Sequence, residues 1–543
     1  MLETASDNWT APRFDWRAAP EQLSGQPVRH PVLIVGAGPV GLSAALDCAA
    51  HGLPVVLIDD NDTVSVGSRA LCYAKRTLEV WNRLGCGDRI AEEGVRWQIG
   101  KVFFRDEMIY QFDLLPQPDH RMPAMVNLQQ YHLEAALVER CQQKAGIDLR
   151  WRHKLVAIEQ RPDHVGLTIE TPEGRYQTEA SWVMACDGAA SDTRSMLDAP
   201  FTGQFFQDRF LIADVVMKAD FPTERWFWFD PPFHPGQSAL LHKQRDRIWR
   251  IDFQLGWDAD PVEERKPERV RARIAQMLGP EVAFELEWVS IYQFACRRID
   301  RFRQGRVLFA GDSAHQVSPF GARGANSGVQ DVDNLAWKLQ LVIEGAAPPA
   351  LLESYHDERS LAADDNIRHS TRSTDFITPK SDSSRLFRNA VLELARDHAF
   401  ARPLVNSGRL SMPTRYSGSS LVSPDIDPFD ADEAAPGCNC PDAPLQVGGR
   451  PGWLLDQLGG GFVLLVFGEA ALALPDLAVG SVHPRVLVVG RDLVDTRGVL
   501  STRYDGRPGT TYLIRPDQYV AARWREFDPA RIRAALARSL AMA

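Results

Sequence analysis

Three glycines near the start of the chain have the spacing needed to bind a nucleotide. Residues 36–41 read GAGPVG, with glycine at positions 36, 38 and 41. In a dinucleotide-binding turn, Gly36 would permit the tight turn, Gly38 would let a pyrophosphate approach the backbone, and Gly41 would let the following helix pack closely. The helix predicted from Val40 would offer unpaired N–H groups to the phosphates. The segment therefore predicts a site for a nucleotide cofactor.

An acidic residue follows at the distance expected for a ribose contact. Asp59 lies 23 residues after Gly36, at the end of a second apolar run. A carboxylate there can accept hydrogen bonds from ribose hydroxyls, which favours an adenosine diphosphate without a 2′-phosphate. Asp60 is the neighbouring alternative to Asp59. The alternative without function is a chance glycine-rich turn beside a solvated aspartate.

The apolar pattern around these residues predicts one β-α-β unit. Residues 32–35 form a short apolar run rich in β-branched types, and residues 54–59 form another. Between them, residues 40–51 carry leucines and alanines at helical spacing. Two buried-type strands joined by a helix favour a parallel sheet.

Other patterns divide the rest of the chain. Residues 248–255 alternate between apolar and polar types, which predicts a half-buried antiparallel strand in a separate, inserted sheet. Residues 400–440 are rich in Pro, Ser, Gly and Asp and predict a linker. The remaining predicted elements are a strand at 307–310, a helix at 326–343, strands at 462–467, 486–489, 511–515 and 518–524, and a helix at 529–541.

Composition excludes several classes of protein. The 543 residues include 61 Lys and Arg against 71 Asp and Glu, so the net charge of −10 gives no general attraction to nucleic acid or anionic membranes. No apolar run approaches the roughly 20 residues that span a bilayer, and the first 30 residues do not form a signal peptide. The eight cysteines are scattered without disulfide or metal spacing, so we expect a cytoplasmic protein without a metal site.

Three further segments indicate a family. Residues 186–194 read CDGAASDTR, residues 311–315 read GDSAH, and residues 319–328 read PFGARGANSG. Together with residues 36–41 they resemble, in order and spacing, the signatures of the class A flavoprotein monooxygenases, the p-hydroxybenzoate hydroxylase and phenol hydroxylase superfamily. The resemblance covers about residues 30 to 375. Residues 319–328 correspond to the family's flavin loop.

The resemblance implies FAD as the bound cofactor and NADH or NADPH as a transient co-substrate. Asp312 would hold the ribityl hydroxyls, with capping of its own loop as the alternative. The helix after the flavin loop would direct amides at the flavin ring and stabilise its charge after reduction. Arg69 would contact the cofactor, with a surface ion pair as the alternative. The predicted cofactor-binding residues are Gly36, Gly38, Pro39, Val40, Gly41, Asp59, Asp60, Arg69, Gln130, Asp187, Gly311, Asp312, Pro319, Gly324, Ala325 and Asn326.

The Asp-Gly motif at Asp187, with Arg194, would by resemblance serve both FAD and the docking of NAD(P)H. No second dinucleotide fingerprint is present in the sequence, which agrees with a nicotinamide that binds only transiently. The implied reaction is reduction of FAD by NAD(P)H, formation of a flavin C4a-hydroperoxide with O2, and hydroxylation of a small aromatic, usually phenolic, substrate, as in aromatic catabolism.

No catalytic base can be assigned from the sequence, so the catalytic prediction is limited to Pro319, Gly321 and Gly324 on the flavin side. An apolar wall must exclude water from this chemistry. Candidates for that wall are Trp226, Phe227, Trp228, Phe229 and Trp249, with ordinary sheet core as the alternative for each.

Polar side chains near the predicted wall have open roles. Arg250 or His242 could meet a carboxylate or phenolate, with solvent exposure as the alternative. For His315, beside the Gly-Asp motif, we expect a structural hydrogen bond rather than a catalytic role.

The predicted fold is α/β: a Rossmann-like FAD-binding domain of the glutathione reductase type, an inserted, mainly antiparallel β substrate domain, and a C-terminal thioredoxin-like domain. The last domain is typical of the 3-(3-hydroxyphenyl)propionate and phenol hydroxylase branch, although Cys438 and Cys440 form C-x-C rather than C-x-x-C, which argues against dithiol catalysis. The expected divisions are an N-terminal extension (1–29), FAD-binding domain (30–200, with substrate-layer strands near 97–123), substrate domain (201–300), return of the FAD-binding domain (301–375), helical segment and linker (376–436) and thioredoxin-like domain (437–543).

We also expect a homodimer. Two other functions remain open at this point: a flavin-dependent dehydrogenase or reductase on the same fold, and a non-catalytic binding protein that retains the fold. Release of peroxide without a hydroxylated product would favour the first. A colourless protein that takes up no FAD would favour the second.

Overall fold

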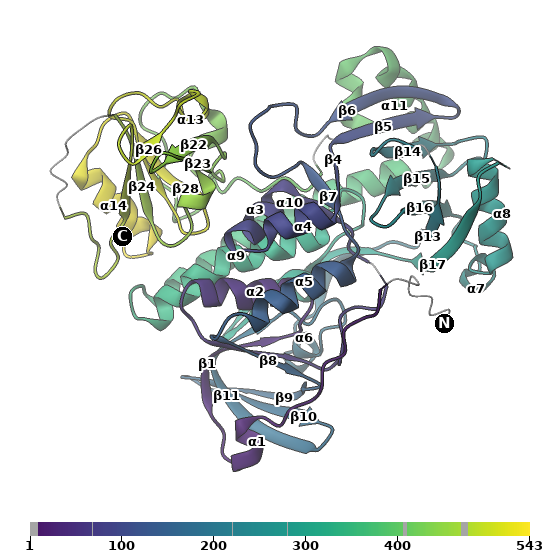
Figure 1. Ribbon diagram of the computed structural model, residues 1–543. Coiled ribbons are helices and arrows are strands. Elements are labelled where there is room, and N and C mark those ends of the chain that lie inside the picture. The colour runs from purple at the N-terminus through teal and green to yellow at the C-terminus, as the bar shows by residue number, and fades with distance from the viewer. Residues whose placement is uncertain (1–8, 68, 220, 280, 406–409, 469–475) are drawn as a thin grey trace.

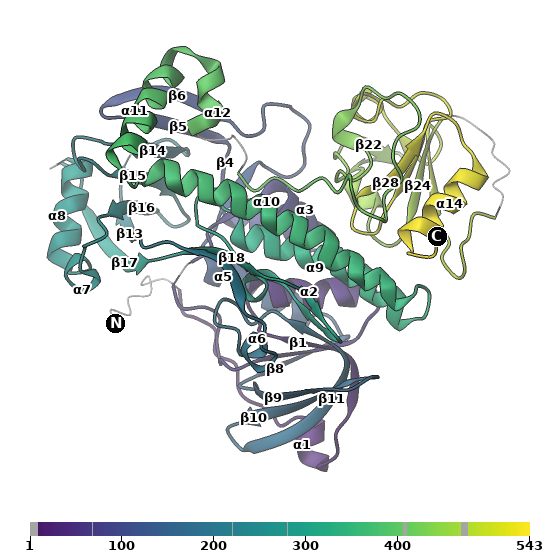
Figure 2. The ribbon, with the colours of Figure 1, turned by 180° about the vertical axis from the view of Figure 1, so that it is seen from behind.

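A computed structural model describes residues 9–67, 69–219, 221–279, 281–405, 410–468 and 476–543. Its largest sheet lies at the bottom of Figure 1, and a seven-stranded sheet lies at the upper right. A C-terminal unit, which has a separate sheet of its own, lies at the upper left. The helices α2 (Pro39–Ala50) and α9 (Gly324–Ile343) lie between them, with α10 (Glu353–Ile377) crossing behind (Figure 2). The architecture is mixed α/β, as predicted.

The eight-stranded sheet is built around parallel strands that are buried on both faces. β1 pairs with β2 and β11, and β20 joins β11 after the whole middle third of the chain has intervened. The predicted β-α-β unit is therefore confirmed, and so is the strand near residue 307. The strands are β1 (Arg29–Val35), β2 (Val55–Asp59), β8 (Ile147–Trp151), β9 (Lys154–Gln160), β10 (Val165–Thr171), β11 (Gly174–Ala185), β19 (Arg303–Gln304) and β20 (Val307–Phe309).

The seven-stranded sheet is antiparallel except where β14 pairs in parallel with β5. Its strand β16 coincides with the predicted strand at 248–255. In sheet order the strands are β17 (Phe284–Tyr292), β13 (Arg209–Met217), β16 (Ile248–Leu255), β15 (Ser238–Lys243), β14 (Arg225–Phe229), β5 (Ile99–Phe104) and β6 (Glu107–Asp113).

The prediction that one face of β16 meets solvent is wrong. Arg250 is only 3% exposed and Gln254 only 6% exposed. The face that carries them is covered by other parts of the chain, since the Phe210 ring packs 4.9 Å from the ring of Phe320 in the flavin loop. The opposite face packs under helix α8 (Pro267–Leu278). Both faces of the sheet are therefore covered at β16.

Two small sheets and several helices connect these layers. The small sheets contain β3 (Cys72–Ala74), β7 (Met125–Asn127) and β4 (Val95–Trp97), and β12 (Phe201–Phe205), β18 (Ala295–Ile299) and β21 (His315–Gln316). The other helices before residue 406 are α1 (Pro20–Ser24), α3 (Lys75–Arg83), α4 (Gly87–Glu93), α5 (Gln130–Gln142), α6 (Asp192–Met196), α7 (Pro261–Glu264), α11 (Asp382–Asp397) and α12 (Arg402–Val405).

The N-terminal extension lies on the body of the protein from residue 9 onward. The Phe14 ring stacks on Trp151 at 4.3 Å, and Glu21 is buried, where it accepts a hydrogen bond from Thr178 at 3.0 Å. Of the two alternatives drawn from the sequence, packing on the body is confirmed for residues 9–28. Residues 1–8 lie outside the described part of the chain.

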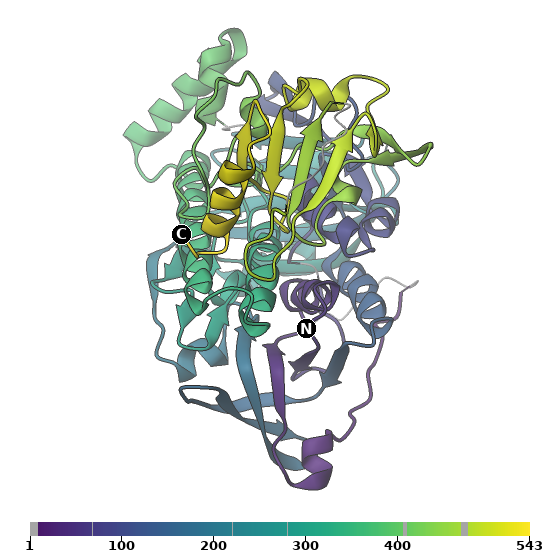
Figure 3. The ribbon, with the colours of Figure 1, turned by 90° about the vertical axis from the view of Figure 1, so that its left-hand side faces the viewer.

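The C-terminal unit faces the viewer in Figure 3. Its sheet contains the strand order β25-β24-β27-β28, in which β24 and β25 are parallel. Strands β27 and β28 form a hairpin before helix α14 (Pro529–Ser539). This is the predicted thioredoxin-like arrangement. The elements are β22 (Pro444–Val447), β23 (Arg450–Trp453), β24 (Val463–Phe467), β25 (Arg485–Val489), β26 (Leu493–Val494), α13 (Val499–Arg503), β27 (Thr511–Ile514) and β28 (Val520–Trp524).

The segment predicted as a linker is largely irregular but not loose. Tyr416 and Leu421 are each only 1% exposed, and the Tyr416 ring stacks on Tyr519 of the C-terminal unit at 4.8 Å. Residues 406–409 are outside the described part. Where it is described, the segment therefore packs against both neighbours instead of hanging between them.

Two general properties bear on the predicted setting. All eight cysteines are free thiols. No helix among the described ranges combines the length and the apolar character required to cross a bilayer.

Candidate functional site

The glycine-rich turn between β1 and α2 has the geometry expected from its sequence. Gly36 has φ +99°, and a Cβ there would lie 2.6 Å from the Cys186 carbonyl oxygen. A Cβ at Gly41 would lie 1.8 Å from the Gly36 carbonyl oxygen. A Cβ at Gly38 would have no protein atom within 4 Å. Packing therefore requires glycine at positions 36 and 41, whereas position 38 is open on the side where a ligand would approach.

Helix α2 begins at this turn with its first N–H groups available. Gly38 is the N-cap residue, Pro39 and Val40 form the first turn, and no side chain caps it. The first turn of a helix has N–H groups without intrahelical partners, and these favour an anion. The arrangement is that of a phosphate-binding turn.

Asp59, rather than Asp60, points toward the turn. The Asp59 carboxylate accepts hydrogen bonds from the Ala37 N–H at 2.6 Å and from the Asn61 N–H at 2.9 Å. Burial raises the pKa of Asp59, while these N–H donors act in the opposite direction. Asp60 is exposed, and its carboxylate accepts only from the Asn61 side chain, at 3.1 Å. Of the two acids, the geometry favours Asp59 for a ribose contact.

The Asp-Gly motif holds neighbouring loops in place. Asp187 accepts hydrogen bonds from Ser191 Oγ at 2.6 Å and from the Thr193 N–H at 2.9 Å. Arg194 donates to the Ser313 carbonyl at 3.3 Å, which links the motif to the turn at Gly311–Ser313. The Asp187 carboxylate is thus engaged by its own loop.

Asp312 lies in that turn, at the carboxyl end of β20. Its side chain is accessible to solvent, and no described residue donates a hydrogen bond to its carboxylate. The surrounding protein raises its pKa, while the charges of His315 and Arg69 lower it. The capping alternative therefore has no hydrogen bond to support it. A carboxylate held in place without a protein donor is suited to accept from a ligand.

The flavin loop leads into α9, whose first turn also lacks a side-chain cap. Gly324 is next to Asp312: a Cβ at Gly324 would lie 3.9 Å from the Asp312 carboxylate oxygen. The uncapped N–H groups of Gly324, Ala325 and Asn326 are thus brought next to the Gly311–Ser313 turn. Gly321 has φ +103°, which favours glycine in this loop.

Two predicted cofactor residues use their side chains to fix loops. Asn326 accepts a hydrogen bond from the Ala74 N–H at 2.8 Å and donates to the Cys72 carbonyl at 2.9 Å. Gln130 accepts from the Ala70 N–H at 2.9 Å, which fixes the loop that carries Arg69. Because the side-chain amides of Asn326 and Gln130 already form hydrogen bonds within the protein, these two residues would bind a cofactor through their backbone atoms.

Arg69 is exposed near Asp312 and Tyr292, whose pKa values it affects. The structure records no ion pair for Arg69 among the residues it describes. The arrangement is compatible with a cofactor contact and gives no support to the surface ion pair.

His315 takes the structural role expected of it, through a network that the sequence did not indicate. Its Nε2 lies 2.6 Å from Asp331 of α9, and Asp331 also accepts from the Gly311 N–H at 2.9 Å and from Arg359 at 2.6 Å. Burial would raise the pKa of Asp331, but His315 and Arg359 hold it below its ordinary value. This buried network fixes the Gly311 turn to α9.

A pocket lies between the seven-stranded sheet and the flavin loop. Its wall from the sheet includes Arg225, Phe227 and Phe229 of β14, and its wall from the loop includes Phe320 and Gly321. The other lining residues are Lys101, Val102, Phe112, Arg323, Ser373, Ile377, Val405 and Leu410. The pocket is predominantly aromatic and apolar, which suits an aromatic ligand.

The three tryptophans predicted to line the substrate site lie on the wrong face of the sheet. Trp226, Trp228 and Trp249 belong to the core cluster beneath α8, on the face opposite to Phe227 and Phe229. Successive residues of a strand point to opposite faces, so only one set can meet the flavin loop. Trp226 and Trp249 belong to ordinary sheet core, the alternative drawn from the sequence, whereas Trp228 also lines a pocket on that face.

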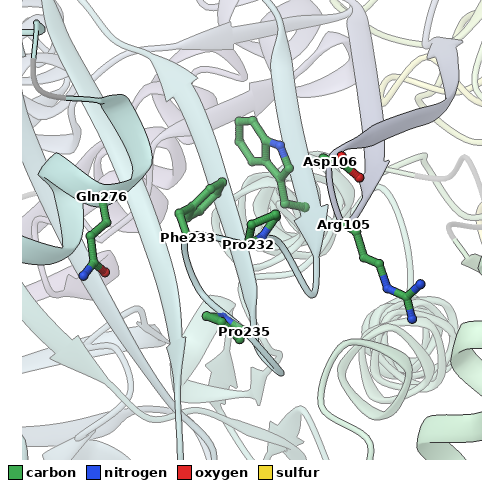
Figure 4. A pocket seen from close by; sticks show the side chains of 7 residues that line it. Arg105, Asp106, Pro232, Phe233, Pro235 and Gln276 are labelled. Atoms are coloured by element: carbon green, nitrogen blue, oxygen red, sulfur yellow. The ribbon is translucent and has the colours of Figure 1, made fainter.

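A second pocket lies on that opposite face and is remote from the flavin loop. Figure 4 shows Pro232, Phe233 and Pro235 on one loop, with Arg105 and Asp106 at a neighbouring turn and Gln276 of α8 on the other side. Trp228 also lines this pocket, whereas none of the cofactor motifs contributes to it.

The two polar side chains considered for the substrate have definite surroundings. Arg250 donates from Nε and Nη2 to the two oxygens of Asp214, each at 2.8 Å. His242 is 3% exposed, and burial, with the charges of Arg225 and Arg250, holds its pKa well below the ordinary value. Solvent exposure is wrong for both, and Arg250 is committed to a protein carboxylate.

Comparison with known proteins gives consistent matches. The model of a family described as FAD binding domain matches residues 29–370, and that described as aromatic-ring hydroxylase, C-terminal, matches residues 433–543. The 6-methylpretetramide 4-monooxygenase of Streptomyces rimosus is 30% identical over 529 residues, which cover 91% of this chain and 90% of that protein. The 3-(3-hydroxy-phenyl)propionate/3-hydroxycinnamic acid hydroxylase of Escherichia coli is 27% identical over 523 residues, covering 90% and 91%.

A solved structure extends the comparison to three dimensions. The flavin-dependent monooxygenase PieE, in complex with FAD and substrate, is matched with a TM-score of 0.81 and 25% identity over 95% of this chain and 99% of that chain. The family-model matches to residues 29–370 and 433–543 include the glycine-rich turn, the flavin loop and the C-terminal unit.

Proposed function

Because the chain belongs to the FAD-dependent aromatic-ring hydroxylases, we propose that it hydroxylates a small phenolic ring in the pocket beside the flavin loop. The family matches confirm the resemblance carried by the three motifs, and with it FAD as cofactor and flavin-dependent monooxygenation as the activity. NAD(P)H is the electron donor typical of this family, and we propose O2 as the source of the oxygen atom. The aromatic pocket shared by the sheet and the flavin loop is the observation that carries this proposal.

The residues present fit four parts of FAD. The open side of Gly38 and the uncapped start of α2 suit the diphosphate, and Asp59 suits the adenosine ribose. Asp312, which has no donor among the described residues, suits the ribityl hydroxyls. The uncapped start of α9 suits the pyrimidine end of the flavin. When bound, FAD supplies the redox chemistry: it accepts electrons from NAD(P)H and activates O2.

The protein's own residues orient the substrate and keep water away from it. Phe227, Phe229 and Phe320 enclose the ring, and Phe320 and Phe229 are only 8% and 2% exposed. The N–H groups at the start of α9 are fixed before reaction by Asn326 and by the Asp331 network, so they can stabilise negative charge without reorganising. The substrate side therefore supplies shape and exclusion of water, and the helix supplies the electrostatic stabilisation.

Turnover of the holoenzyme tests this function. NADH or NADPH consumption is measured against a panel of phenols and aromatic acids, with hydroxylated product and hydrogen peroxide measured in the same samples. We expect at least one compound to give product in near-equal amount to the NAD(P)H consumed. Peroxide alone across the panel would contradict hydroxylation and favour a flavin reductase or oxidase.

Replacing Asp312 by alanine is expected to weaken FAD binding. The ribityl hydroxyls would lose a charged acceptor worth about 1.5–3 kcal/mol, so the dissociation constant should rise roughly tenfold to 150-fold. Titration of apoprotein with FAD, followed by flavin fluorescence, measures the change. Asp258→Ala, at an exposed position near the end of β16, is the control and should bind FAD as the wild type does. Unchanged affinity in Asp312→Ala would show that the assignment is wrong.

We also propose a homodimer working in the cytoplasm. The dimer is supported by exposed apolar side chains on α11 and the segment after it, of the kind that subunit interfaces bury. The side chains are Leu386, Phe387, Leu394, Phe400 and Leu404. The cytoplasmic location is supported by the eight free thiols. A monomeric mass in sedimentation equilibrium would contradict the dimer.

A further inference from the structure

Arg225 differs from the other cations near the substrate pocket because its charge has no protein acceptor. It lies at the start of β14, on the face that carries Phe227 and Phe229, and lines the same pocket. Its Nη1 atom is buried, and within the described part of the chain its guanidinium forms neither a hydrogen bond nor an ion pair. Its recorded protein contact is the face of the Trp97 ring, 5.9 Å from Cζ.

Among the residues that the structure describes, the neighbouring cations are all engaged. Lys101 pairs with Glu224 at 2.7 Å. Arg250 forms the two hydrogen bonds to Asp214 described above, and Arg323 donates to the Phe320 carbonyl at 2.7 Å. Of the described cations on this wall, Arg225 is therefore the one without a hydrogen bond or ion pair.

The described groups that face Arg225 from adjacent strands form no hydrogen bond or ion pair with it. His242 is its cross-strand partner on β15 and is neutral, with a buried Nε2 that has no partner. Arg225 also affects the pKa of Asp252 on β16. Burial raises the pKa of Asp252 to about 6, while the positive charges of Arg250 and Arg225 act to lower it. No ion pair between Asp252 and Arg225 is present in the described part of the chain, and the Asp252 Oδ1 atom is buried there without a hydrogen-bond partner. In the described part of the chain, the adjacent strands thus supply no hydrogen-bond acceptor to the Arg225 guanidinium at this end of the aromatic pocket.

We propose that Arg225 binds a carboxylate of the substrate, so that the enzyme prefers aromatic acids to neutral phenols of the same shape. This inference rests on the proposed function. A guanidinium donates two parallel hydrogen bonds to a carboxylate, and such a bond is stronger than a neutral one. Residues two apart on a strand are separated by about 6.6 Å. An aromatic ring packed against Phe227 would therefore place the carboxylate of a short side chain near Arg225.

A matched pair of ligands tests the preference. The probes are 3-(3-hydroxyphenyl)propionate and its primary amide, which share the ring and the chain but differ in charge. Their dissociation constants are measured from the change in flavin absorbance of the holoenzyme. We expect the wild type to bind the acid about tenfold or more tightly than the amide. Equal binding of the two would overturn the proposal.

Variants identify the residue responsible. Arg225→Gln should reduce the acid-to-amide ratio to about one, raise KM for the acid and leave the FAD content unchanged, whereas Arg225→Lys should restore part of the preference. Arg271→Gln, which removes an exposed cation from α8 on the other side of the sheet, should keep the wild-type ratio. Preference for the acid that survives in Arg225→Gln would overturn the assignment.

The same samples separate this inference from the proposed function. Hydroxylation of neutral phenols as efficiently as of acids would overturn the role of Arg225 and leave the hydroxylase function standing. NAD(P)H oxidation that yields only peroxide with every ring compound would overturn the function, and the binding ratio would still decide whether Arg225 recognises a carboxylate.

Discussion

Gly38→Val is expected to yield a folded, colourless protein. A side chain at position 38 has no protein atom within 4 Å, so valine can be accommodated without a clash in the protein itself. Its isopropyl group would, however, fill the space in which the FAD diphosphate approaches the start of α2. We expect FAD affinity to fall by about 100-fold or more, equivalent to about 2.8 kcal/mol, and the purified protein to lose its flavin absorbance.

The matched control for this variant is Gly418→Val. Gly418 also has open space around its Cβ position and no positive φ, but it lies far along the chain from the cofactor turn. Both variants should give the circular dichroism of the wild type, and Gly418→Val should remain yellow. A yellow Gly38→Val protein with normal flavin content would show that the diphosphate binds elsewhere.

The cofactor half of the molecule could be predicted because its signals are local. The glycine at 41 is required by a contact with Gly36 in the same turn, and β2 ends at Asp59 as the apolar run indicates, although the contact that requires glycine at 36 comes from Cys186 at the end of β11. The hairpin and helix at the end of the chain are equally local. In each case neighbouring residues in sequence decide the geometry, so pattern and structure agree.

The substrate half could not be predicted in the same way, because its geometry depends on strand pairing between distant segments. Residues 225–229 carry aromatic side chains on both faces, and the sequence does not say which face meets the flavin loop. That is decided by pairing of β14 with β5, more than a hundred residues earlier in the chain. Likewise, the sequence alone makes Arg250 a candidate for binding a ligand. The pairing of β13 with β16 places Asp214 opposite Arg250, and the Asp214 carboxylate accepts its hydrogen bonds.

The C-terminal unit is joined to the cofactor half through buried charges, which the sequence also did not indicate. Arg515, at the end of β27, donates to both oxygens of Glu358 of α10, at 2.6 and 2.9 Å, and to Asp517 at 3.0 Å. Lys338 of α9 donates to Glu358 at 2.8 Å. All four side chains are 0–1% exposed, and α9 is the helix that begins at the flavin loop.

Arg515→Met is expected to cost about 3–5 kcal/mol of stability, because removal of one partner leaves buried carboxylates without compensation. Arg531→Met, which breaks a surface pair with Asp528, is the control and should cost at most about 1 kcal/mol. Denaturant unfolding followed by both flavin fluorescence and circular dichroism measures the two effects. Arg515→Met with the stability of the control would show that the buried pair contributes nothing to docking.

The pH dependence of the same variant gives an independent check. Burial alone would raise the pKa of Glu358, but Arg515 and Lys338 lower it well below its ordinary value. A carboxylate with a lowered pKa in the folded state contributes stability above its unfolded pKa, about 4.3, and loses that contribution as the pH falls. Without Arg515 the lowering is smaller, so the loss of stability as the pH falls from about 4.5 toward about 2 should be smaller in Arg515→Met than in the wild type. An identical loss in both proteins would mean that Arg515 does not hold Glu358 in its ionised form.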